Sequence, residues 1–290
     1  MDISVDVLGY LFWILLLITM ISPWLSLRSL RAARLRLISE IERRYGHRVI
    51  TMIHRQEKVG LLGVPIYRYI DIEDSEAVLR AIRSTPGNVP IMLILHTPGG
   101  LVLAASQIAR ALKSHPSRKV AVVPHYAMSG GTLVALAADE IIMDPNAALG
   151  PLDPQLGTPN GMYVPAPSIL RAVEAKGRER ADDETLIMAD VAEKSLKQMR
   201  ELVVELLRDR MGEDGAAKVA DALVSGRYTH DYPLTVEQLR ELGLKVSTDV
   251  PPEVYALMGL YPQARTNRPG IEYLPYPIAP RQSQGDGERR

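Results

Sequence analysis

The segment from residue 88 to residue 144 alternates between apolar runs typical of buried strands and amphipathic runs typical of helices. The strand-like runs are NVPIMLIL (88–95), KVAVVPH (119–125) and EIIMD (140–144), and helix-like runs at 101–115 and 129–140 separate them. Strands that alternate with helices at this spacing form βαβ units and a mainly parallel sheet. The sequence therefore predicts an α/β fold.

The same pattern extends on both sides of this segment. VITMIH (49–54) alternates like a strand, and residues 74–84 have helical spacing. Further predicted elements are helices at about 183–210, 216–224 and 235–242, and a last strand that begins at LKV (244–246). Thr235 is the predicted N-cap of the 235–242 helix, and Gly243 ends it. Residues 145–183 are rich in Pro and Gly, which predicts turns.

Composition excludes several function classes. The formal net charge of the 290 residues is +0, which argues against nucleic acid as the main partner. The chain has no cysteine, so disulfides, thiolate nucleophiles and Cys-based zinc sites are excluded. We find neither metal-ligand spacing among His, Asp and Glu nor a phosphate-binding loop, and we predict no metal and no cofactor.

Residues 7–27 form an apolar run without a charge. A helix of this length spans roughly 30 Å, the thickness of a bilayer core. The residues before the run are acidic, and arginines follow it. A cleaved signal peptide would instead begin with basic residues and end at a small-residue cleavage site. These features predict a membrane anchor over residues 1–27 that contacts lipid through 7–27, and a juxtamembrane helix over 28–46. The predicted location is the cell membrane, with a single span and a cytoplasmic domain.

Two glycine-rich turns carry the candidate chemistry. LHTPGG (95–100) ends a predicted strand and precedes a helix, and such turns expose backbone N–H groups that suit an oxyanion. HYAMSGG (125–131) stands at the next strand-to-helix junction, where Ser129 is either a nucleophile or a helix N-cap. Because both turns leave the same end of the sheet, together they favour acyl transfer.

These motifs carry a resemblance to a known family. TPGG, MSGG and DEIIMDPNAALGPLDPQLG resemble the Clp-protease/crotonase fold in its serine-peptidase branch. With the apolar N-terminal run and GRYTHDYPLTVEQLRELGL, the chain is most similar to the membrane-anchored serine dehydrogenase proteinases, with kinship to signal peptide peptidase A. The resemblance implies a Clp/crotonase-like βαβ spiral core with an N-terminal transmembrane helix. The peptidase domain would span 47–261, followed by a Pro-rich tail over 262–290.

The resemblance also implies roles for individual residues. Ser129 would be the nucleophile, and the amides of Gly99 or Gly100 with that of Gly130 would form the oxyanion hole. The catalytic histidine of the Clp pattern is missing, because Leu152 and Asp153 stand where it is expected.

Two replacements for this base stay open. One is His230 oriented by Asp153, in the Ser, Asp, His order of the family. The other is a Ser–Lys dyad with a desolvated lysine, for which Lys194 is a better candidate than Lys176 or Lys197. His96 and His125 follow strands close to the two motifs and are interpreted as polar strand-end residues.

The resulting prediction is a serine endopeptidase that forms an acyl-enzyme on Ser129 and acts on a peptide or membrane-protein substrate. Relatives of the fold assemble into rings or stacked trimers, so a homo-oligomer is expected. One rival is an inactive scaffold of the same fold that binds a membrane partner. A second rival, acyl-CoA chemistry of the crotonase type, would leave Ser129 without a role.

Overall fold

The computed structural model describes residues 3–54, 57–58, 65–66, 68–158 and 161–261. A five-stranded sheet lies at its centre, with strand order β1–β4–β5–β7–β11 and every neighbouring pair parallel. The strands are β1 (Arg48–Ile53), β4 (Ile91–His96), β5 (Lys119–Val123), β7 (Glu140–Met143) and β11 (Val246–Ser247). The predicted α/β fold with a parallel sheet is confirmed.

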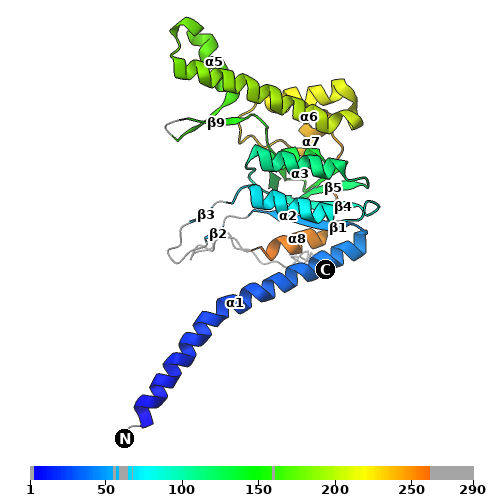
Figure 1. The fold of residues 1–290 in the computed structure, drawn as a ribbon. Helices are drawn as coiled ribbons and strands as arrows, with labels where there is room; N and C mark the ends of the chain where they lie inside the picture. Colours follow the sequence, from blue (N-terminus) through cyan, green and yellow to red (C-terminus); the bar gives the residue numbers. More distant parts are fainter. Residues whose placement is uncertain (1–2, 55–56, 59–64, 67, 159–160, 262–290) are drawn as a thin grey trace, which may run out of the picture.

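Helices cover both faces of this sheet (Figure 1). One face packs against α2 (Ile72–Arg83), α3 (Val102–Ser114), α4 (Gly130–Leu136), α6 (Asp183–Val224) and α7 (Val236–Glu241). The other face packs against the end of α1 (Ile3–Tyr45) and against α8 (Pro252–Gly259). Successive strand residues point to opposite faces, so Leu93 joins the first layer and Ile94 the second. All of β4 is buried, as expected for a central strand.

Short elements occupy the loops around the sheet. They are β2 (Glu57–Lys58), β3 (Pro65–Ile66), β6 (Tyr126–Ala127), β8 (Ala148–Leu149), β9 (Gln155–Gly157), β10 (Tyr163–Pro165), α5 (Ala166–Lys176) and the 3₁₀ helix η1 (Arg178–Arg180). β6 pairs with β8 in parallel, and β9 pairs with β10 antiparallel. The segment 145–183, predicted to consist of turns, thus contains three strands and two helices. Its prolines do not prevent α5, because Pro167 lies in the first turn, where a helix needs no N–H.

The two helices predicted for 183–210 and 216–224 are present as the two parts of α6. α6 is bent at Gly212, whose φ of 74° lies outside the helical region. At α7, the Thr235 side chain accepts a hydrogen bond from the Gln238 amide, which confirms the predicted N-cap. Gly243, just beyond α7, has a φ of 86°.

The membrane prediction is wrong. The run 7–27 is helical, but it belongs to the longer helix α1, which continues into a segment with an arginine every few residues. Across the ranges that the structure describes, no helix is both long enough and apolar enough to cross a membrane. The transmembrane span, the lipid contact and the single-pass location therefore lose their basis. The C-terminal part of α1 packs on the domain, where Ile41 is fully buried and Arg44 pairs with Glu253 of α8. The tail predicted for 262–290 lies outside the described residues.

Candidate active site

Ser129 stands between β6 and α4 in a strained backbone conformation. Its φ is 49° and its ψ is −120°, and it is the one non-glycine residue with a positive φ in the described part of the chain. Such a conformation costs a residue with a side chain on the order of 1–3 kcal/mol. Ser129 occupies the N-cap position of α4, but its side chain makes no capping hydrogen bond. The hydroxyl is therefore held at a sharp turn without serving the helix.

The 97–100 loop lies directly against Ser129. A Cβ added to Gly99 would lie 2.7 Å from the Cβ of Ser129 and 2.9 Å from the carbonyl oxygen of Met128. The Met128 amide donates to the Thr97 carbonyl at 2.9 Å, which joins the two turns through their backbones. Only glycine at position 99 permits this approach, because its φ is 106° as well.

The amides of the three predicted oxyanion glycines differ in their partners. The Gly99 amide donates to the Thr97 Oγ1 at 3.2 Å and is already occupied. For the amides of Gly100 and Gly130, the described residues provide no hydrogen-bond acceptor. A Cβ on Gly130 would lie 3.5 Å from the nitrogen of Gly100, so the two residues are neighbours. Gly100 and Gly130 are therefore the two neighbouring amides that have no hydrogen-bond partner among the described residues.

Asp153 and His230 form a hydrogen-bonded pair. The Nδ1 of His230 lies 2.8 Å from the Oδ1 of Asp153, which is 2 % exposed. The other carboxylate oxygen accepts from the Nε2 of Gln155 at 2.7 Å, so both oxygens of this buried acid are bonded. Two backbone hydrogen bonds between Leu149 and Leu234, 3.2 and 2.8 Å long, join the loops that carry the pair.

A single cavity of about 690 Å³ brings these groups together. Its polar lining includes Ser129, Asp153 and His230, with Gly100 and Gly130 beside them. The volume is typical of a ligand site. In the part of the chain that the structure describes, no hydrogen bond joins His230 to the Ser129 hydroxyl; catalytic contacts of this kind often form only with substrate bound.

The three candidate lysines lie outside the cavity, and so do His96 and His125. Lys194 is exposed and pairs with Asp190 at 2.5 Å, and Lys176 and Lys197 are exposed as well. None of the three lysines lines the cavity. His96 and His125 stack on one another with ring centroids 5.7 Å apart, outside the cavity lining.

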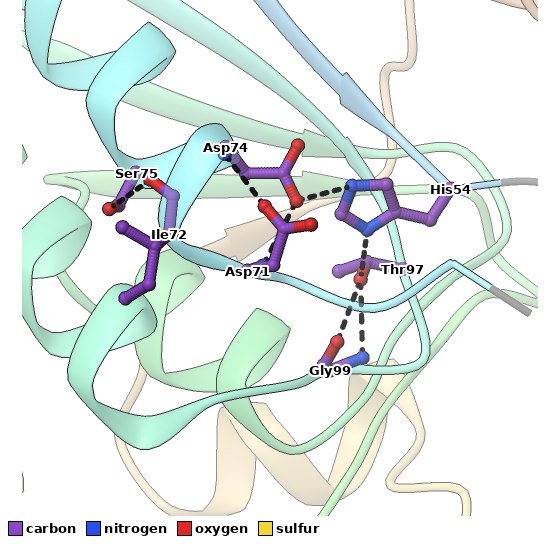
Figure 2. A network of polar contacts seen from close by, with 7 residues as sticks. All are labelled: His54, Asp71, Ile72, Asp74, Ser75, Thr97 and Gly99. Carbon is purple, nitrogen blue, oxygen red and sulfur yellow. Dashed lines mark hydrogen bonds and ion pairs between the residues drawn. The ribbon is translucent and has the colours of Figure 1, made fainter.

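A further polar network, not predicted from the sequence, lies behind the 97–100 loop (Figure 2). His54 lies between Asp74 and Thr97, 3.1 Å from the Asp74 Oδ2 and 2.9 Å from the Thr97 Oγ1. Burial alone would raise the pKa of the Asp74 carboxyl, but hydrogen bonds from His54 and from the Asp71 amide outweigh it and lower the pKa. The one signal in the sequence is the position of His54, at the end of the VITMIH run and thus at the same sheet end as the two turns.

The sequence matches a known protein family over residues 1–288. The family is described as ClpP-like SDH-type serine proteinase. Two similar proteins of Methanocaldococcus jannaschii carry the names uncharacterized protein MJ0137 and uncharacterized protein MJ1495. MJ0137 is 54% identical over 268 residues, which cover 92% of this chain and 92% of that protein. MJ1495 is 53% identical over 281 residues, which cover 97% of this chain and 93% of that protein.

Solved structures show similarity at lower identity. The 1510-N membrane-bound stomatin-specific protease aligns with a TM-score of 0.45 and 20% identity, covering 65% of this chain and 79% of that chain. ClpP1 from Listeria monocytogenes aligns with a TM-score of 0.41 and 15% identity, covering 70% of this chain and 92% of that chain.

Proposed function

The chain belongs to the ClpP-like SDH-type serine proteinase family, and from this premise we propose that it hydrolyses peptide bonds through an acyl-enzyme on Ser129. One observation supports the proposal above all others. A hydroxyl at a strained turn, two neighbouring backbone amides and an Asp–His pair line the same cavity. These are the groups that acyl transfer requires.

The proposed mechanism assigns one task to each group. The Nε2 of His230 takes the proton of the Ser129 hydroxyl as its oxygen attacks the carbonyl carbon of the peptide. The amides of Gly100 and Gly130 donate to the resulting oxyanion. His230 then gives the proton to the leaving amine, and the same residues activate the water that releases the acyl group.

Asp153 would orient the base. Its Oδ1 accepts from the Nδ1 of His230, which leaves the Nε2 unprotonated and directed away from the carboxylate. Gln155 holds the second oxygen, so the carboxylate cannot rotate freely. This support favours His230 over Lys194, whose charge is stabilised by Asp190 and by solvent.

The cavity wall beside these groups fits a peptide with an apolar side chain. Leu101, Val102, Leu133 and Met199 line it. Burial of an aliphatic or aromatic side chain there would contribute about 1.5–3 kcal/mol to binding.

A fluorogenic peptide with an apolar residue before the scissile bond tests the proposal. The wild-type chain should release the fluorophore and react with a fluorophosphonate probe, and Ser129→Ala should do neither. His230→Ala should lose turnover, whereas the matched change Lys194→Ala should keep it within about twofold, because exposed ion pairs contribute little. Equal turnover by wild type and Ser129→Ala would contradict the role of Ser129, and a wild type with neither turnover nor labelling would favour the inactive scaffold.

We retain the homo-oligomer as a second part of this proposal. The hairpin of α5 and α6 extends away from the sheet (Figure 1) and exposes Ile187 and Val191, which supports a contact with another copy. Light scattering of wild type and of Ile187→Lys tests it: the wild type should have the mass of an oligomer, and the variant a lower mass.

A further inference from the structure

Three polar side chains, of which His54 and Thr97 are buried and Asp74 is partly exposed, connect helix α2 to the 97–100 loop (Figure 2). His54 follows β1 and is 5 % exposed, and Thr97 is 0 % exposed. The imidazole of His54 joins Asp74, in the first turn of α2, to the hydroxyl of Thr97. That hydroxyl accepts the hydrogen bond of the Gly99 amide.

The hydrogen atoms of this chain can be assigned by counting donors and acceptors. The Asp74 Oδ2 also accepts from the Asp71 amide at 3.1 Å, so it acts as an acceptor, and the Nε2 of His54 must carry a proton. The Nδ1 of a neutral imidazole is then an acceptor for the Thr97 hydroxyl hydrogen. A lone pair of Thr97 remains for the Gly99 N–H. The Gly99 carbonyl oxygen is a second acceptor within reach of the Thr97 hydroxyl, at 3.4 Å, but the His54 Nδ1 is nearer, at 2.9 Å, and gives the chain a single direction.

The network determines where the Gly100 amide points. The carbonyl oxygen of Gly99 accepts from the Ile70 amide at 2.7 Å. The Gly99 C=O and the Gly100 N–H belong to one planar trans peptide, so they point in opposite directions. Fixing the carbonyl on Ile70 therefore directs the Gly100 N–H away from Ile70, toward the side of Gly130.

Asp74 supports the backbone on both sides of the Gly99 Cα. Through His54 and Thr97 it holds the Gly99 amide. Through the Asp71 amide it holds the backbone next to Ile70, whose N–H binds the Gly99 carbonyl. One carboxylate is thus connected to the loop by two routes.

We propose that Asp74 and His54 are positioning residues, which hold the Gly100 amide in place for the oxyanion through Thr97 and Ile70. The proposal rests on the proposed function, in which Gly100 is an oxyanion donor. It gives the network a role in the rate of the chemical step rather than in substrate binding.

Kinetics of threonine variants in the full chain test this role. Thr97→Val keeps the shape of the side chain but removes the hydroxyl, so kcat should fall by about 10–100-fold, less than the loss of a whole oxyanion donor, with KM within about threefold. Thr97→Ser should restore kcat to within about threefold. Thr85→Val is the matched control, because among the described residues the buried Thr85 hydroxyl bonds only the Ala81 carbonyl, and its kcat should equal that of wild type. A kcat of Thr97→Val equal to that of Thr85→Val would overturn the proposal.

A second measurement does not depend on turnover. Nitrogen NMR of histidine-labelled protein, with the His54 signals identified by their loss in His54→Gln, should show a protonated Nε2 and an unprotonated Nδ1. Amides 99–101 should exchange with solvent faster in Thr97→Val than in Thr85→Val. The opposite tautomer, or equal exchange in both variants, would also overturn the proposal. A wild type with this tautomer but no peptide hydrolysis would instead contradict the proposed function alone.

Discussion

The Nδ1 of His230 lies 2.8 Å from the Oδ1 of Asp153, a residue 77 positions earlier in the chain. The acid is buried and the imidazole is partly exposed toward the cavity, with side-chain exposures of 1 % and 33 %. This combination suits an acid that orients a base and a base that reaches a substrate.

Asp153→Asn should lower kcat by about 10³–10⁴-fold, because an amide NH₂ group at this position would favour the wrong histidine tautomer. The measurement is kcat and KM on a fluorogenic peptide. Asp231→Asn, an identical change at an exposed neighbour of His230, is the control and should keep wild-type kcat. Equal loss in both variants would show that the Asp153 contact has no special role.

Ser129→Gly should be more stable than Ser129→Ala by about 1 kcal/mol, because glycine adopts a positive φ without strain. Both variants lack the hydroxyl, so urea unfolding compares backbone strain alone. At Ser84, whose φ of −79° and ψ of −8° are helical, the order should reverse, with alanine more stable than glycine. The same order at both positions would contradict the strain at Ser129.

Gly99→Ala should abolish fluorophosphonate labelling and lower the free energy of unfolding by several kcal/mol, because the added methyl group would collide with Ser129 and Met128. Gly177→Ala provides the comparison. Its φ is 85°, but a Cβ there would meet nothing within 4 Å, so backbone strain of about 1 kcal/mol is the expected cost. Retained labelling in Gly99→Ala would show that the two turns are not in contact.

Glu140→Gln should weaken the fold at neutral pH and lose that effect in acid. Burial raises the pKa of the Glu140 carboxyl from its ordinary 4.5, but Arg118 and Lys245 outweigh burial and lower it. A carboxyl whose pKa is lowered in the folded state stabilises the fold at pH values above its unfolded-state pKa. This contribution is lost as the pH falls through the folded-state pKa. The difference from wild type should be about 1 kcal/mol at pH 7 and smaller near pH 3. Urea unfolding at both values measures it, and a difference that persists at pH 3 would refute it.

The sequence predicts the central sheet well because its strands are continuous apolar runs between helices. It also predicts both turns, since parallel strands place their C-terminal ends at one edge. Helix α5 and the β9–β10 hairpin were not predicted, because prolines at a first helical turn look the same in sequence as prolines in a loop. The apolar run 7–27 was misinterpreted because it continues into a single long helix.

The site was predictable where short motifs carry it and not where distant elements meet. Ser129 and the glycines stand in two compact turns. The positive φ of Ser129 could not be predicted from the sequence, because a residue other than glycine does not indicate a left-handed backbone. His54 and Asp74 belong to different elements, and only the packing of α2 beside β1 places them together.

The two hydrogen bonds between Leu149 and Leu234 bear on how the protein is made. During synthesis a chain emerges from its N-terminus, and early segments fold before late ones exist. The serine and its glycine turns would leave the ribosome well before the segment that carries His230. Until that late segment docks on the 149–155 loop, a nascent chain holds Ser129 without His230. Under the proposed mechanism, the serine would therefore gain its base only late in synthesis.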